Sequence, residues 1–180
     1  MVLGGTRPTG DVDFGVVGSR ADRWTEIESA ILAAAEEAGV AVQYSTDIDR
    51  WSSIAIPPRR WKTRPWRRIG PLSVHLLDPA CWAVYKLARY LDADGDDLRS
   101  VLRHERVPPA RLARLCGESL RTSPKSTQLL AFRRHVEHFF SAHGRAVWGS
   151  TFDSRRAIGA FHRAAGIAAA STRRPASPRR

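Results

Sequence analysis

Two aspartates separated by one residue, Asp11 and Asp13, point more directly to chemistry than any other residues of this chain. On a β-strand, residues i and i+2 share a face, so both carboxylates would project to the same side. Such a pair can hold one or two Mg²⁺ ions against a triphosphate. The glycine-rich stretch before it, from Gly4-Gly5 to Thr9-Gly10, is backbone that can approach phosphates closely. The segment predicts a metal and phosphate site, with a solvated strand end as the alternative.

A second group of charged residues follows about 70 residues later in the pattern K-x-x-R-x-x-x-x-D-x-x-D: Lys86, Arg89, Asp94 and Asp97. On one continuous helix these four residues would fall within an arc of about 140°. Gly95 interrupts that helix, so a shared face is firm only for the lysine and the arginine. The cations would bind nucleotide phosphates, and a carboxylate would order them or remove a proton. A solvated helix surface with charge pairs is the alternative.

The first segment resembles the G-G/S…T-x-D-[IV]-D signature of the polymerase-beta-like nucleotidyltransferase superfamily. It is most similar to small bacterial members related to AbiEii-type toxins of toxin–antitoxin systems, and the second group is similar to the lysine–arginine and D-x-x-D helix of the same relatives. The resemblance covers residues 1–104. It implies Mg²⁺ held by Asp11 and Asp13, an NTP bound by Gly4, Gly5, Thr9, Lys86 and Arg89, and catalysis supported by Lys86 with Asp94 or Asp97.

The chain departs from that family in two places. Relatives place a helix between the paired glycines and the aspartates, whereas only five residues separate Gly5 from Asp11 here. An N-terminally truncated core, with the glycines as a loop before the strand, accounts for this spacing. The usual third carboxylate on a later strand is not evident, and His75 stands where it would be expected. A catalytically decayed nucleotidyltransferase fold that serves only for interaction is therefore an alternative to an enzyme.

The net charge of +11 is concentrated in two places. Seven basic residues and no acid lie between Arg50 and Arg68, interleaved with Trp51, Trp61 and Trp66, and the C-terminal end is also rich in arginine. Arginine beside exposed aromatic rings is typical of RNA-binding surfaces, so this region predicts an RNA or tRNA partner. The alternative is a hairpin whose tryptophans pack on the sheet. A basic nucleic-acid-binding protein is a further interpretation, although nine residues between helices 110–116 and 126–142 are too many for a helix-turn-helix.

Hydrophobic periodicity and capping residues predict the elements that position these groups. Strands are expected at 12–17, 40–44, 53–56 and 72–77, with a loop or hairpin over 57–71. Helices are expected at 23–38, at 80–91 after Asp78 and Pro79, at 96–103, from Pro109 to Cys116 with Gly117 as its end, at 126–142 closing before Gly144, and from Asp153 or Ser154 to about 170. We therefore predict an α+β fold with a minimal nucleotidyltransferase-type mixed sheet and helices over 1–104, a helical region over 105–170, and a disordered basic tail over 171–180.

Composition predicts the compartment of the protein and whether it contacts a membrane. The sequence contains no run of 18 apolar residues, which excludes a transmembrane helix and predicts no membrane partner. Its two cysteines, Cys81 and Cys116, lie in apolar stretches and are expected to be reduced core residues, so we expect a cytoplasmic protein. The combined expectation is a toxin-like, Mg²⁺-dependent enzyme that transfers a nucleotidyl group from an NTP to an RNA or protein hydroxyl. The toxin resemblance also implies an antitoxin partner.

Overall fold

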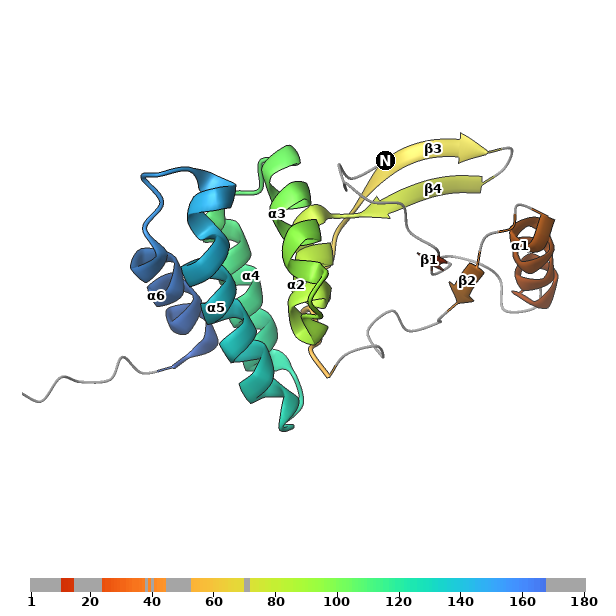
Figure 1. Cartoon of the computed structure of the whole chain (residues 1–180). Helices are drawn as coiled ribbons and strands as arrows, with labels where there is room; N and C mark the ends of the chain where they lie inside the picture. Colours follow the sequence, from red (N-terminus) through yellow and green to blue (C-terminus); the bar gives the residue numbers. More distant parts are fainter. Residues whose placement is uncertain are drawn as a thin grey trace, which may run out of the picture.

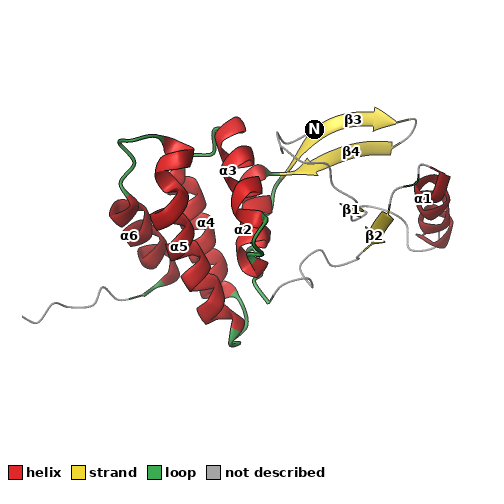
Figure 2. Ribbon diagram, viewed as in Figure 1, coloured by secondary structure: helices red, strands yellow, loops and turns green. Residues whose placement is uncertain are grey.

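The computed structural model describes residues 11–14, 24–37, 39, 41–44, 53–69 and 72–167. In these residues the chain is an α+β fold, with a helical bundle formed by the second half (Figure 1; Figure 2). The elements are β1 (Asp11–Phe14), α1 (Trp24–Glu37), β2 (Ala41–Tyr44), β3 (Thr63–Ile69), β4 (Leu72–Leu77), α2 (Pro79–Arg89), α3 (Asp94–His104), α4 (Pro109–Thr122), α5 (Gln128–Trp148) and α6 (Ser154–Ala165).

The described strands form two separate pairs. Strands β1 and β2 run parallel, with Asp11 opposite Ala41 and Asp13 opposite Gln43, and α1 is the crossover between them. Strands β3 and β4 form an antiparallel hairpin with a bulge between Pro65 and Arg67. The strand expected at 72–77 is thus confirmed as β4. Its partner β3 lies within 57–71, where the sequence predicted a loop or hairpin without placing this strand, and a single mixed sheet of the nucleotidyltransferase type stays a prediction.

Helix α2 begins where the sequence predicts. The Asp78 carboxylate accepts hydrogen bonds from the backbone amides of Ala80 and Cys81 at 3.0 and 3.4 Å, and Pro79 occupies the first turn. This cap satisfies amides that have no partner inside the helix, and proline loses nothing there because it has no amide hydrogen. The other Asp78 oxygen accepts a hydrogen bond from Nη2 of Arg111 in α4 at 2.7 Å, so the cap also ties the start of α2 to α4.

Two glycines that were expected to end helices lie inside them. Helix α4 continues through Gly117 to Thr122, and α5 continues through Gly144 to Trp148. A Cβ atom at Gly117 would lie 2.5 Å from the Phe161 carbonyl oxygen of α6, and one at Gly144 would overlap the ring of Phe152. Both predicted ends were wrong because these glycines serve close packing between elements rather than termination.

The strand predicted at Ser53–Ile56 was also wrong, although its apolar alternation is meaningful. Ile54 and Ile56 are buried in the core, but the backbone amides between them do not pair with a strand. The Ser53 amide donates to Oε1 of Gln128 at 3.2 Å, and the Ala55 amide donates to Oγ of Ser123 at 2.8 Å. Side chains at the α4–α5 connection take the place of a neighbouring strand.

The hydrophobic core lies within the bundle α2–α6. Its largest fully buried side chains are Phe132, Phe139, Phe140, Phe161, Leu87, Leu98, Leu102 and Leu112.

Cys81 and Cys116 are buried and not disulfide-bonded, as expected, and burial raises the pKa of both thiols. No helix in the described ranges combines the length and the apolar character needed to cross a bilayer. The predicted tail, 171–180, lies outside these ranges.

Candidate functional site

The paired aspartates lie on β1. Positions 11 and 13 share one face of this short strand, as the prediction of a joint metal site requires. The helix α1 follows and returns the chain to β2, so the pair belongs to a parallel β-α-β unit. Gly4, Gly5 and Thr9, the predicted phosphate contacts, lie outside the described residues.

The second predicted group forms one compact cluster at the junction of α2 and α3. Lys86 and Arg89 occupy the last turn of α2, and Asp94 and Asp97 occupy the first turn of α3. Between the helices the chain reverses at Tyr90, whose backbone adopts a left-handed conformation with φ of 44°. The four residues therefore meet across two helices, in line with the separate helices expected at 80–91 and 96–103. The expected break at Gly95 was wrong, because Gly95 lies inside α3 and the chain turns at Tyr90.

Asp94 is the centre of this cluster and is only 1% exposed. Its carboxylate accepts hydrogen bonds from Nζ of Lys86 at 2.9 Å, from Nε and Nη2 of Arg89 at 3.2 Å each, and from the Leu91 amide at 2.9 Å. Burial by itself would raise the pKa of Asp94, but the hydrogen bonds from Arg89, Lys86 and Leu91 outweigh it and lower the pKa. Asp94 is therefore held as an anion that positions two cations, which suits it poorly to accept a proton.

The two cations differ in their access to solvent. The Lys86 side chain is 17% exposed, lies 3.6 Å from Oδ2 of Asp97, and sits 5.6 Å from the centre of the Trp82 ring. The Arg89 side chain is 54% exposed although it holds Asp94. A phosphate arriving from solvent could contact the outer part of the Arg89 guanidinium while the inner part stays on the carboxylate.

The two predicted halves of the site lie in different parts of the described chain. Figure 1 shows β1 apart from α2 and α3, and no extensive contact joins β1 to either helix in the described part of the chain. Within the same part, no group of three or more histidine, cysteine, aspartate or glutamate residues could hold a metal ion. Magnesium at Asp11 and Asp13 stays a prediction.

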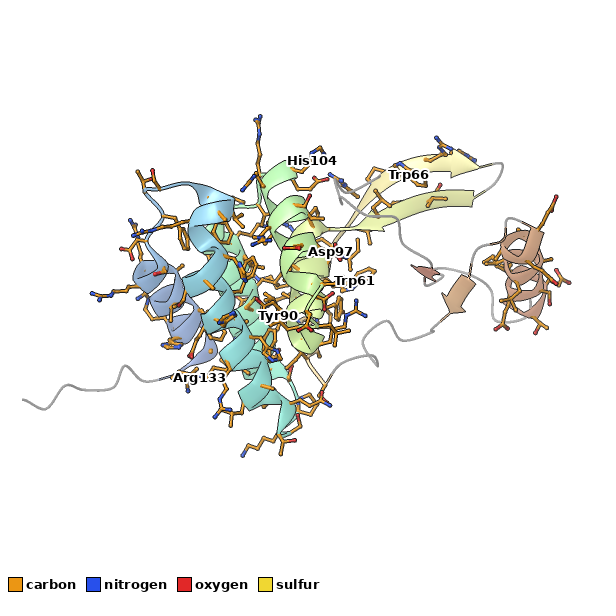
Figure 3. All side chains as sticks on the ribbon, viewed as in Figure 1. Trp61, Trp66, Tyr90, Asp97, His104 and Arg133 are labelled. Atoms are coloured by element: carbon orange, nitrogen blue, oxygen red, sulfur yellow. The ribbon has the colours of Figure 1, made fainter. Side chains whose placement is uncertain are left out.

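The described part of the basic region, residues 53–68, contains some side chains held by the bundle and others that are exposed. Trp61 packs against the core, whereas Trp66 on β3 is 45% exposed, and Figure 3 shows it on the hairpin away from the bundle. Trp51 lies outside the described residues. Arg60 pairs with Glu118 through two hydrogen bonds, and Arg64 pairs with Glu105 in the same way. The sequence could not tell these tryptophans or these arginines apart.

Three histidines of α5 lie beside the α2–α3 junction, where they contact Tyr90 and Arg99 in a way that the sequence did not predict. The Tyr90 ring lies 5.2 Å from that of His135 and 6.0 Å from that of His138, measured between ring centres. The His138 ring in turn lies 5.8 Å from that of His143, whose Nδ1 is 3.4 Å from Nη1 of Arg99. Burial lowers the pKa of His143, and the positive charges of Arg99 and His138 lower it further. No spacing in the sequence connects Tyr90 or Arg99 with these rings.

Comparison of the chain with known protein families, with curated proteins and with solved structures gave no match in any of the three.

Proposed function

We propose that this chain is a Mg²⁺-dependent nucleotidyltransferase that transfers a nucleotidyl group from an NTP to an RNA or protein hydroxyl. The observation that carries the proposal is the buried carboxylate of Asp94, which holds Lys86 and Arg89 side by side at the α2–α3 junction. A buried ion cluster is a weak contributor to stability compared with apolar packing of the same volume. Such clusters occur often at functional sites, where they fix charges in place.

The geometry of the cluster supports a role in holding phosphates. Lys86 and Arg89 are balanced in number by Asp94 and Asp97. Arg89, whose side chain is 54% exposed, is the cation that a nucleotide phosphate could reach from solvent. The Asp94 carboxylate already orders the side chains of Lys86 and Arg89. Binding a nucleotide phosphate would therefore cost little further side-chain conformational entropy. Asp94 acts here as a positioning residue, and Asp97, 3.6 Å from Lys86, is the better placed of the two to face a ligand.

The β-α-β unit supports the other half of the proposal. Asp11 and Asp13 fall on the same face of a parallel strand, and two carboxylates so spaced suit the oxygen-rich coordination that Mg²⁺ prefers. Bound there, Mg²⁺ would neutralise charge on the triphosphate and on the departing pyrophosphate. An antitoxin partner is a further proposal that rests on the toxin resemblance alone.

Labelling with radioactive nucleotides tests the transfer reaction. The full chain is incubated with Mg²⁺, total RNA and each [α-³²P]NTP in turn, and label in RNA and in protein is measured separately. The double variant Asp11→Ala/Asp13→Ala should lose labelling entirely. The matched control is Glu36→Ala/Glu37→Ala, which removes two exposed carboxylates from the end of α1 and should label as the unchanged chain does. Undiminished labelling by the aspartate variant refutes the proposal.

A second candidate is a catalytically decayed nucleotidyltransferase fold that binds partners without chemistry. The observation that favours it is the separation of β1 from the Lys86–Arg89 cluster, together with His75 on β4 in place of the expected third carboxylate. Calorimetry distinguishes the two candidates. ATP, GTP, CTP and UTP are each titrated with and without Mg²⁺, and an active site should bind at least one of them in a metal-dependent way. A decayed site should bind none.

A further inference from the structure

The hairpin β3–β4 is fixed to the bundle at its base. Trp61 and Leu77 pack against the core, and the Asp78 amide donates to the Lys62 carbonyl oxygen at 2.9 Å. Above this point Arg64 holds Glu105 through two hydrogen bonds of 2.8 and 2.7 Å. The distal half of the hairpin extends away from the helices (Figure 1; Figure 3). The base is therefore structural, whereas Pro65, Trp66, Arg67 and Arg68 farther along β3 are exposed to solvent.

Trp66 is the residue that breaks the pairing of the distal half. Pro65 lies opposite His75 and Arg67 lies opposite Val74, so Trp66 is the extra residue of the bulge. A bulge re-aims the side chain it carries, and here it leaves a tryptophan 45% exposed. The guanidinium of Arg67 lies 5.0 Å from the centre of that ring. The ring and a cation therefore stand together at the surface, an arrangement on which a nucleic-acid base can stack.

The chain on either side of Trp66 carries charge of one sign only. From residue 53 to residue 77 the chain carries six basic residues and no acid. Arg60 and Arg64 are neutralised by Glu118 and Glu105, which belong to the bundle. Arg67 and Arg68 are exposed beside the tryptophan, and Pro65, Ser73 and His75 line the same shallow hollow. An exposed ring flanked by cations complements a strand of alternating bases and phosphates.

We propose that the distal half of hairpin β3–β4 binds single-stranded RNA, with a base stacked on Trp66 and phosphates held by Arg67 and Arg68. A single strand is the occupant because only an unpaired base offers its face to the ring, and a duplex would meet the cations alone. The choice of RNA over DNA rests on the proposed transfer to an RNA hydroxyl. The stacking surface is distinct from the Lys86–Arg89 cluster, so its binding requires neither Mg²⁺ nor NTP.

Fluorescence anisotropy with a labelled 12-nucleotide oligouridine tests the proposal, using the full chain without Mg²⁺ or NTP at several KCl concentrations. Trp66→Leu should weaken binding about 5- to 100-fold, and Trp66→Phe should restore most of it because a phenyl ring still stacks. Arg67→Gln/Arg68→Gln should lower the slope of log affinity against log salt by about 1.4, the value for two phosphate contacts to a single strand. All these positions are exposed, and circular dichroism checks that each variant is folded.

The matched control is Arg155→Gln/Arg156→Gln, which removes two exposed arginines of α6 while leaving the hairpin intact. It should keep the affinity and the salt slope of the unchanged chain. The proposal is overturned if Trp66→Leu binds as tightly as the unchanged chain, if the α6 variant weakens binding as much as the hairpin variant, or if duplex RNA binds as tightly as the single strand. Single-stranded DNA that binds at least tenfold more tightly than RNA overturns the choice of RNA. Because no NTP is present, none of these results bears on the transfer reaction.

Discussion

Nζ of Lys86 and Oδ1 of Asp94 lie 2.9 Å apart and join the last turn of α2 to the first turn of α3. The arrangement also suits both helices. Cations at the end of α2 and acids at the start of α3 each face the helix pole of opposite partial charge. The same four charged residues therefore stabilise two helix ends and the turn between them. This gives the cluster a structural effect that can be measured separately from any effect on nucleotide binding.

Asp94→Asn should destabilise the fold strongly. The amide keeps the shape of the side chain but leaves Lys86 and Arg89 without their shared anion, and removing one member of a buried ion pair costs about 3–5 kcal/mol. Urea unfolding followed by circular dichroism measures the loss. Asp92→Asn removes an exposed carboxylate two residues earlier and should change the free energy of unfolding by no more than about 0.5 kcal/mol. Equal effects of the two substitutions would show that the cluster is not a single unit.

Arg89→Gln should weaken nucleotide binding while changing the free energy of unfolding only a little. Its side chain is half exposed, and Asp94 keeps the bonds from Lys86 and the Leu91 amide, so we expect a loss of about 1 kcal/mol or less. Nucleotide affinity measured by calorimetry should fall about tenfold, because one charge-assisted contact to phosphate is lost. Arg155→Gln, an exposed arginine of α6, is the control and should leave affinity unchanged. An Arg89 variant with full nucleotide affinity would remove this residue from the proposed site.

Two glycine-to-alanine substitutions should have opposite signs. At Gly117 the added methyl group would meet the Phe161 carbonyl oxygen and the Ala164 Cβ at 2.5 and 2.6 Å, so α4 and α6 must separate, at a cost of about 1–3 kcal/mol. At Gly159 the nearest atom is 3.4 Å away, at the end of the flexible Arg163 side chain. Alanine there should stabilise α6 by about 0.4–1 kcal/mol, since it limits the unfolded chain. Thermal and urea unfolding measure both changes, and a stabilising Gly117→Ala would contradict the close packing.

Stability should fall as the pH drops below about 6.5, the value at which an unperturbed imidazole gains its proton. Burial, Arg99 and His138 keep folded His143 neutral to a lower pH than this. In the window between the two pKa values the unfolded chain binds a proton that the folded chain does not, so protonation favours unfolding. The loss is complete once the pH passes below the folded pKa.

Unfolding by urea at pH 7.5, 6.5, 5.5 and 5.0 measures this slope. His143→Gln should flatten it, whereas His104→Gln, which removes an exposed histidine of α3, should leave it unchanged. An identical slope in both variants would assign the pH dependence to other groups.

Capping residues and short-range sequence patterns predicted the elements whose boundaries depend on residues nearby in the chain. The Asp78-Pro79 start of α2 followed from capping alone, and the strand at 72–77 followed from its alternating pattern. Its partner strand in the proline- and arginine-rich stretch was not predicted. Gly117 and Gly144 were misinterpreted because the rule that glycine ends helices is local, whereas their role depends on Phe161 and Phe152, which lie far along the chain. Ser53–Ile56 failed for the same reason, since its hydrogen-bond partners come from the α4–α5 connection.

The candidate site likewise has features that the sequence predicted and features that depend on the fold. Spacing alone selected Lys86, Arg89, Asp94 and Asp97, and the structure joins them. The spacing gave no sign that Asp94 is buried, because a solvated and a buried aspartate look identical in a sequence. Trp61 and Trp66 differ in the same way, one packed on the core and one exposed at a bulge. The roles of Asp11 and Asp13 in metal binding stay predictions.

The close approach of α4 and α6 at Gly117 has a consequence for the order in which the protein can assemble. The surface of α4 that carries this glycine is covered only by residues 44 and more positions later, around Phe161 and Ala164. A growing chain on the ribosome would therefore expose this surface of α4 until α6 emerges. Chaperones and proteases would meet that surface first, so variants that weaken α6 should reduce yield in the cell before they change any binding property.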